Sequence, residues 1–99
     1  MNSELEKKVI EWAREKGILE KSNPKAQLTK TLEEVDELVE AINDDNKEEV
    51  EDAIGDVIVT LIIQAELWGL SANDCLETAY NIIAKRTGKM VDGVFVKDS

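Results

Sequence analysis

The apolar residues of this chain recur at helical spacing in one segment and become nearly continuous in a later one. In the first segment they follow one another at intervals of four, three, four and three residues, on a single face of a helix: Leu28, Leu32, Val35, Val39 and Ile42. From Val57 to Ala65 the chain is apolar nearly all round. We therefore expect this second segment to be packed on several sides, inside one molecule or across a subunit interface.

Capping signals divide the chain into four helices, which we expect near residues 4–16, 24–43, 47–68 and 71–87. The residues that begin them carry side chains able to accept a hydrogen bond from the first turn: Ser3, Asn23, Asn46 and Ser71. Pro24 fits the first position of the second helix, and glycines at 17, 69 and 88 end the first, third and fourth. The end of the chain alternates weakly around Asp92-Gly93, which predicts a turn or a short extended strap.

Four helices joined by short links predict an all-α fold, with a four-helix bundle-like core and a short extended C-terminal tail. The 99 residues are few enough for one domain, which we place at 1–99. A lone domain of this size buries a limited fraction of its surface, so we expect it to assemble as an oligomer.

The composition narrows the choice of partners and chemistry. The net charge of −10 repels nucleic-acid backbones and anionic membranes, so neither a nucleic acid polymer nor a membrane is an expected partner. The longest run dominated by apolar residues, Val57 to Ile63, is too short to span a bilayer, and the N-terminus lacks a signal-peptide pattern. Cys75, a lone cysteine, fits an apolar filler in a reducing compartment, so we expect a cytoplasmic protein. The absence of histidine excludes Ser-His and Cys-His catalysis and the usual zinc sites.

Acidic residues on two successive helices are placed to face one another. Glu34 and Glu37, three residues apart, share a face of the second helix beside its apolar stripe. Asp52 and Asp56, four residues apart, point toward the buried side of the third helix. If these helices form an antiparallel hairpin, the four carboxylates meet across it. Two unit charges about 4 Å apart repel by roughly 4 kcal/mol at an effective dielectric near 20, so protons or a cation must compensate them.

Oxygen ligands without cysteine or histidine favour a hard cation, Mg²⁺ or in its place Mn²⁺. Gly55 supports a site here, because a helix-interior glycine costs about 1 kcal/mol and a close approach by ligand or backbone would justify it. The alternative is that the acids form a solvated face, with Asp56 favoured by the helix dipole. A calcium loop at "DDNKEE" is excluded, since its sixth and twelfth positions hold Glu49 and Gly55 instead of glycine and glutamate.

These residues resemble the motif of the MazG-like, all-α nucleoside triphosphate pyrophosphohydrolases, particularly the short single-domain forms of phages and bacteria. The family pattern on one helix is E-E-x-x-E, and "EEVDE" at residues 33–37 matches it in full. The pattern on the next helix is E-x-x-D followed by aliphatic residues. Asp56 matches the aspartate, whereas Ala53 stands where the glutamate is usual and Asp52 is the nearest acid that would replace it.

The end of the chain carries a second match. "NIIAKRTGKMVDGVFVK" is similar to the ending of the phage-type members, in which a helix with a basic pair leads into G-K-M and G-V-F-V-K. The resemblance covers about residues 25–97 and implies assembly as a homodimer or homotetramer.

The resemblance implies hydrolysis of an NTP or dNTP to the monophosphate and pyrophosphate with Mg²⁺ as cofactor. The implied metal ligands are Glu34, Glu37, Asp52 and Asp56, and the implied catalytic residues are Glu33, Glu34 and Glu37. Glu33 would hold the attacking water or bind a further metal. The candidates for contacts to the substrate are Lys30, Asn81, Lys85, Arg86 and Lys89. Trp12 and Trp68 would stack on a base or, alternatively, pack in the core or at a subunit contact.

Two other functions stay open at this point. The chain could be a non-catalytic acidic helical interaction module, with the stripe from Leu28 to Ile42 as a seam for a partner. It could also bind metal and nucleotide with weak turnover, because Ala53 departs from the family pattern.

Overall fold

The computed structural model describes residues 3–98. Its elements, in chain order, are α1 (Ser3–Glu15), α2 (Ile18–Lys21), α3 (Pro24–Asn43), α4 (Lys47–Leu67), α5 (Ala72–Ile83), β1 (Gly88–Val91) and β2 (Val94–Lys97). The mostly helical fold is confirmed, and the four expected helices correspond to α1, α3, α4 and α5. The single turn of α2 is an addition that no capping signal indicated.

Three of the expected N-caps are confirmed. The side-chain oxygens of Asn23, Asn46 and Ser71 accept hydrogen bonds from backbone N–H groups three residues further on, at 2.9, 3.2 and 3.3 Å. The side chain of Ser3 lies outside the described part of the chain. Gly17 has a left-handed φ of 78°, which ends α1 where the sequence places its stop.

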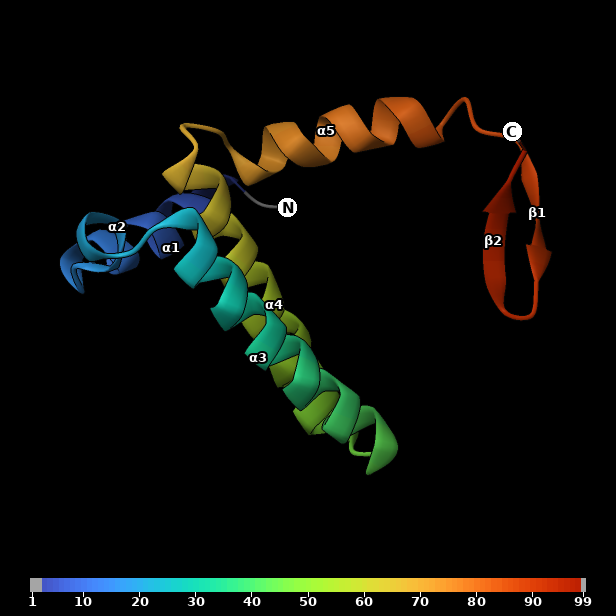
Figure 1. Cartoon of the computed structure of the whole chain (residues 1–99), viewed down its shortest axis with the longest axis horizontal. Coiled ribbons are helices and arrows are strands. Elements are labelled where there is room, and N and C mark those ends of the chain that lie inside the picture. Colours follow the sequence, from blue (N-terminus) through green and yellow to red (C-terminus); the bar gives the residue numbers. More distant parts are fainter. Residues whose placement is uncertain (1–2, 99) are drawn as a thin grey trace.

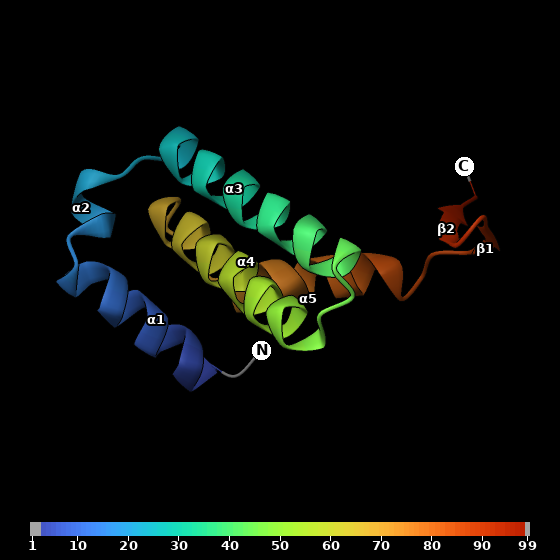
Figure 2. The same ribbon diagram turned by 90° about the horizontal axis from the view of Figure 1, so that it is seen from below.

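The α3 and α4 helices form an antiparallel pair, and α1 packs on the opposite side of α4 (Figures 1 and 2). We refer to α3 and α4 together as the helical hairpin. Two side-chain amides connect its helices: Gln27 Nε2 donates to the Thr60 carbonyl at 3.1 Å, and Gln64 Nε2 donates to the Pro24 carbonyl at 3.0 Å.

The core is small, and its buried apolar residues are four alanines and two isoleucines: Ala13, Ala41, Ala53, Ile62, Ile63 and Ala65. The apolar stripe of α3 is not covered by the chain, since Leu32 and Ile42 are 57% and 59% exposed. Ile58 and Leu61 of α4 are exposed as well. The segment from Val57 to Ala65 is therefore not packed on all sides within one chain.

The α5 helix leaves the helical hairpin instead of packing along it. Its axis is bent by 100° from that of α4, and Figure 1 shows it pointing away from α3 and α4. The four-helix bundle is thus not completed within one chain, which corrects the expected architecture. Gly69 makes the turn with a φ of 70°. The buried Glu6 of α1 then fixes the start of α5, because its Oε1 accepts from Ser71 Oγ at 3.1 Å and from the Ala72 N–H at 2.9 Å.

The strap expected at the end of the chain is an antiparallel β-hairpin. Val91 pairs with Val94 beside the turn, and Asp92 and Gly93 both have positive φ, 50° and 82°. Positive φ at both central residues is what a two-residue type I′ turn requires, and Asp-Gly is well suited to it.

The α5 helix ends at Ile83, before the expected end at Thr87. Thr87 belongs to the β-hairpin instead: its Oγ1 donates to Asp98 Oδ2 at 2.8 Å, and its carbonyl accepts from the Asp98 N–H at 2.9 Å. We refer to α5, β1 and β2 together as the arm. Among the described residues no single helix is long and apolar enough to cross a membrane, and α4 and α5 pass that test only as a bent pair.

Candidate metal centre

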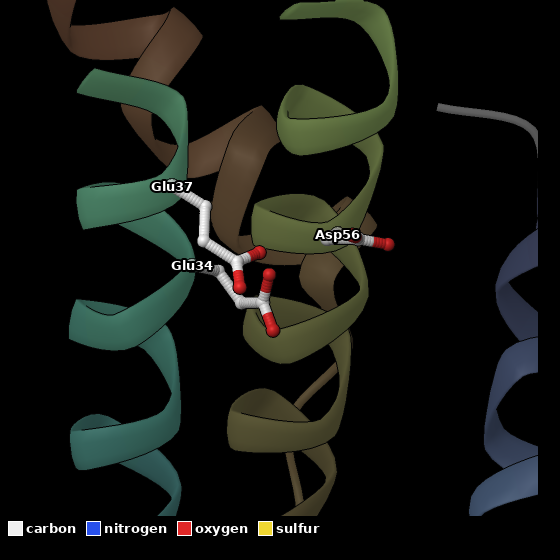
Figure 3. Close-up of side chains that lie close together, drawn as sticks. All are labelled: Glu34, Glu37 and Asp56. Carbon is white, nitrogen blue, oxygen red and sulfur yellow. The ribbon is translucent and has the colours of Figure 1, made fainter. Parts of the chain in front are cut away.

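Three carboxylates from the two helices of the helical hairpin lie close together. Glu34 and Glu37 of α3 and Asp56 of α4 each offer an oxygen within 4.8 Å of the others. Figure 3 shows the two glutamates extending from α3 toward α4. The spacing of three residues puts both glutamates on one face of α3, and the antiparallel pairing brings Asp56 to them. We refer to Glu34, Glu37 and Asp56 as the carboxylate cluster.

Glu34 is the buried member of the carboxylate cluster, and only one of its two carboxylate oxygens has a partner. Its Oε1 lies 3.1 Å from Lys30 Nζ, and this hydrogen-bonded ion pair holds the pKa of Glu34 below its ordinary value. Its Oε2 is buried without a hydrogen-bond partner. An unpartnered buried carboxylate oxygen is costly, so the carboxylate fits the place of a cation ligand.

The other two carboxyl groups of the cluster, those of Glu37 and Asp56, have raised pKa values. A proton on Glu37 would be shared with Glu34 in a hydrogen bond that the two ionised carboxylates do not make, and this hydrogen bond and the charge of Glu34 raise the pKa of Glu37. Burial raises the pKa of Asp56, and the charges of Asp52 and Glu34 add to the effect. A divalent cation among them would reverse both effects, because it favours the charged form of every ligand. The donor set, oxygen only, fits Mg²⁺ or Mn²⁺.

Asp52, expected as a fourth ligand, is not brought into the carboxylate cluster. It is exposed one turn before Asp56 and acts on it through charge. At 100° per residue, positions three and four before Asp56 fall on opposite flanks of it, and the buried flank is taken by Ala53. Asp52 nevertheless lines one groove with Glu37 and Ala53, so its role as a metal ligand stays a prediction.

Two further expected residues lie at the edge of the carboxylate cluster. Lys30 lies between two acids of α3, 3.1 Å from Glu34 and 3.6 Å from Glu33. Glu33 is exposed on the solvent side of Lys30 and does not share the cluster. Lys30 thus lies at the site, but its ammonium group already forms ion pairs with two carboxylates.

The remaining candidates for substrate contacts are not brought to the carboxylate cluster within one chain. Asn81 lies in α5, Lys85 and Arg86 follow that helix, and Lys89 lies in β1. Figure 1 shows this part of the arm far from the helical hairpin, because α5 departs at a large angle. Within one chain these residues therefore lie apart from the cluster, and their contacts with the substrate stay a prediction.

A cavity of about 220 Å³ lies beside the carboxylate cluster. Glu34 and Asp56 line it together with Trp12, Ile18 and Gln27. Ile18 belongs to α2, which no capping signal predicted. Gln27 lies two helical turns before Glu34 and shares its face. Trp12 is 46% exposed at this cavity, so it is not a core residue within the chain.

Gly55 has open space where its side chain would be. A Cβ placed on it meets nothing within 4 Å, so no backbone approaches it closely within the chain. It lines a surface groove together with Asp52 and Asp56. The close approach expected at Gly55 is therefore not made by this chain itself.

Comparison with known proteins gives two matches. The model of a protein family described as the MazG nucleotide pyrophosphohydrolase domain matches residues 22–91. An uncharacterised 18.2 kDa protein in the rep-hol intergenic region of Haemophilus phage HP1 is 32% identical over 63 residues, which is 64% of this chain and 39% of that protein. The chain thus matches less than half the length of this relative. No solved structure matches it.

Proposed function

This chain belongs to the MazG nucleotide pyrophosphohydrolase family, and from that premise we propose that it is a Mg²⁺-dependent nucleoside triphosphate pyrophosphohydrolase. The reaction converts an NTP or dNTP and water into the monophosphate and pyrophosphate. The observation that carries the proposal is the carboxylate cluster with its buried, unpartnered Glu34 oxygen. A protein of net charge −10 repels a triphosphate unless a cation lies between them.

Glu34, Glu37 and Asp56 would hold the cation, and a bound Mg²⁺ would supply charge neutralisation for the triphosphate and acidify a water molecule. Asp52, one turn from Asp56, would hold the hydration shell of the ion or a second ion at its exposed flank. Glu33 is exposed beside the cluster, where its carboxylate would orient the attacking water and accept its proton.

Lys30 would change partners when substrate binds. In the free protein its ammonium compensates Glu34 at 3.1 Å. A cation on Glu34 would make that compensation redundant, so Lys30 could turn to a phosphate oxygen without leaving a buried charge unpaired. The cavity beside the cluster would take the nucleoside, with Trp12 at its edge for stacking.

We further propose that the protein works as a homodimer or homotetramer in a reducing compartment, the cytoplasm. Support for assembly comes from the uncovered apolar stripe on α3, and support for the compartment comes from the single free thiol, Cys75.

The test is pyrophosphate release from a panel of NTPs and dNTPs, with and without Mg²⁺. We expect Mg²⁺-dependent turnover that Glu37→Gln and Asp56→Asn each reduce by at least about 100-fold, since each removes a ligand charge at the metal. Asp36→Asn, an exposed acid of the same helix outside the cluster, is the matched control and should keep the wild-type rate.

Three results would count against the proposal in different ways. Wild-type rates in both Glu37→Gln and Asp56→Asn would show that the carboxylate cluster is not the active site. Nucleotide binding in Mg²⁺ without turnover would indicate a binding protein, in keeping with Ala53 at the usual glutamate position. If there is no turnover and Mg²⁺ does not change the thermal stability, the result would favour the alternative function, a non-catalytic acidic interaction module.

A further inference from the structure

The cavity of about 220 Å³ beside the carboxylate cluster is lined in part by polar side chains that the proposed metal chemistry does not use. They are Gln27 of α3 and Thr60 of α4, which are only 5% and 4% exposed. Burying a polar group is costly unless it is hydrogen-bonded. Both side chains are hydrogen-bonded, but each uses only part of its capacity.

The amide of Gln27 is oriented by α4. Its Nε2 donates to the Thr60 carbonyl at 3.1 Å, and because a carbonyl can only accept, this bond fixes which end of the amide faces α4. Within residues 3–98 Gln27 Oε1 has no hydrogen-bond partner, and the fully buried oxygen that lacks one there is Glu34 Oε2. Gln27 Oε1 is therefore a free acceptor that opens to the cavity.

The hydroxyl of Thr60 is an acceptor toward the cavity as well. Its Oγ1 donates to the Val57 carbonyl of the same helix at 2.7 Å. A hydroxyl carries one hydrogen, so Thr60 Oγ1 keeps its lone pairs for a ligand but has no further hydrogen to donate. Because Gln27 is bonded to the Thr60 carbonyl, the two residues are direct neighbours, and the cavity presents two acceptors close together.

Donors in the cavity lining are few. Besides the amide nitrogen of Gln27, the lining side chains that can donate are Lys30 and Trp12. Lys30 is already paired with Glu33 and Glu34. A ligand that enters with N–H groups foremost satisfies the free acceptors, whereas one that enters with an oxygen foremost leaves them unpaired.

The two acceptors lie at a suitable distance from the carboxylate cluster. Gln27 precedes Glu34 by seven residues of α3, which is about 10 Å along the helix axis, and Thr60 lies one turn beyond Asp56 on α4. A nucleoside has a comparable length between its phosphate and the far edge of its base. The cavity volume lies below the about 300–1,000 Å³ of sites that enclose a whole ligand, so this cavity suits the base and leaves the phosphates at the cluster.

We propose that this cavity selects nucleotides whose base carries an exocyclic amino group, as cytosine and adenine do, over the oxo bases uracil and hypoxanthine. The inference rests on the proposed function, which puts the phosphates at the carboxylate cluster. The two N–H groups of the amino nitrogen donate to Gln27 Oε1 and Thr60 Oγ1. An oxo base turns an oxygen toward the same acceptors and leaves all of them without a donor, away from water.

The test compares substrates that differ in this one group: dCTP with dUTP, and dATP with dITP. In each pair, kcat/KM for Mg²⁺-dependent pyrophosphate release should be at least about 10-fold higher for the amino base, because a site that hydrogen-bonds a group discriminates against analogues that lack it. The triphosphate of 2-pyrimidinone deoxyriboside, which has neither an amino nor an oxo group at that position, should fall between dCTP and dUTP. Equal rates within either pair, or a preference for the oxo base, would overturn the selection.

A variant tests the role of Gln27. Gln27→Met removes the free acceptor at nearly the same side-chain length, so the ratio of kcat/KM for dCTP to that for dUTP should fall close to unity through a loss for dCTP. Gln64→Met is the matched control. Gln64 also connects the helical hairpin through its amide, at 3.0 Å from the Pro24 carbonyl, but it lines a different cavity, so this variant should keep the wild-type ratio.

A structural role for Gln27 gives a different result. If Gln27→Met lowers both rates by the same factor, Gln27 only supports the fold and the assigned recognition is wrong. Should Gln27→Met fail to fold, Thr60→Val removes the other acceptor while keeping the β-branched shape, and it should also lower the ratio. An unchanged ratio in Thr60→Val would equally contradict the selection.

A binding measurement separates this inference from the proposed function, because it needs no turnover. The α,β-imido analogues of dCTP and dUTP cannot be hydrolysed between these two phosphates, and calorimetry in Mg²⁺ measures their affinities. Binding of the dCTP analogue at least about 10-fold tighter, in a protein that releases no pyrophosphate from dNTPs, would uphold the selection and refute the enzyme. Equal binding of both analogues by an active enzyme would refute the selection alone.

Discussion

The helical hairpin (residues 24–67) is longer than the arm (residues 72–97), and the two regions are held in opposite ways. In the helical hairpin, Gln27 and Gln64 connect α3 to α4 and the small core lies at its centre. In the arm, no residue from Asp74 onward is buried within the described chain, and the two strands pack only as a pair. The first region is a folded unit with an acidic site, and the second leaves its large apolar residues exposed within its own chain.

On the proposed function, this contrast would explain how an acidic protein handles an anion. The helical hairpin carries the carboxylates that would hold a cation. Residues 84–99 carry net positive charge, and the bend between α4 and α5 directs this part of the chain away from the carboxylate cluster.

The largest effect on turnover that would sharpen the comparison between the helical hairpin and the arm is expected from substitutions in the arm. Lys85→Ala/Arg86→Ala should lower kcat/KM by at least about 100-fold, because it removes two charge-assisted hydrogen bonds to phosphate that contribute about 1.5–3 kcal/mol each. Steady-state pyrophosphate release measures it, and the melting temperature should stay unchanged. Lys97→Ala, at the far end of β2, is the control. Equal rates in all three proteins would leave the arm without a role in binding substrate.

The helical hairpin should respond to metal where the arm does not. Mg²⁺ at 100 times its Kd stabilises the native state by about 2.7 kcal/mol. Thermal melting of the wild type should therefore rise by roughly 10 °C or more. Asp56→Asn should lose this increase and Lys85→Ala/Arg86→Ala should keep it. An increase of the same size in Asp56→Asn would separate metal binding from the carboxylate cluster.

Some of the features on which these outcomes depend could be predicted from the sequence, and others could not. The caps at Asn23, Asn46 and Ser71 are local signals, so the helix starts were predictable. The meeting of Glu34 with Glu37 follows from helical spacing, and the meeting with Asp56 follows from a short link between α3 and α4.

The features that sequence reasoning missed depend on long-range contacts. The direction of α5 is set by Glu6, which reaches Ser71 across 65 residues, and no local pattern indicates that bond. Beyond the end of α5, Thr87 pairs with Asp98, and helix-capping signals do not indicate this contact either. Whether Asp52 is a ligand stays a prediction, because helical spacing alone does not decide which flank of Asp56 faces α3.

A smaller effect is expected at Gly55, in the middle of α4. Because a Cβ there meets nothing within 4 Å, Gly55→Ala should stabilise the metal-free protein by about 0.5–1 kcal/mol through helix propensity. Chemical denaturation without metal measures it. If the variant is more stable yet loses turnover, a substrate or a second copy approaches Gly55. If it is less stable, the space around Gly55 is not open.

The smallest effect concerns pH, because Glu37 and Asp56 are largely open to solvent screening. Their pKa values are raised in the folded state, so their contribution to stability is present at low pH and is lost as pH rises through the folded pKa. The pKa of Glu34 is lowered in the folded state, so its contribution to stability has the opposite pH dependence. That contribution is present above the unfolded pKa and is lost as pH falls through the folded pKa. Metal-free protein should therefore gain stability from neutral to mildly acidic pH.

Glu37→Gln should flatten that pH dependence and raise the melting temperature of the metal-free protein at neutral pH, since it removes the repulsion between Glu37 and Glu34. In saturating Mg²⁺ the sign should reverse, because protons then compete with the metal for its ligands. A wild type that loses stability steadily from neutral pH downward without metal would contradict the assignment of the two raised pKa values.

The most direct measurement of the central claim is Mn²⁺ titration followed by electron paramagnetic resonance, which records the free ion. Wild type and Asp36→Asn should remove the free-ion signal at low micromolar to millimolar Mn²⁺, and Mg²⁺ should restore it by competition. Glu34→Gln, Glu37→Gln and Asp56→Asn should each leave most of the ion free. If these three variants bind Mn²⁺ as tightly as the wild type, the carboxylate cluster does not hold the metal.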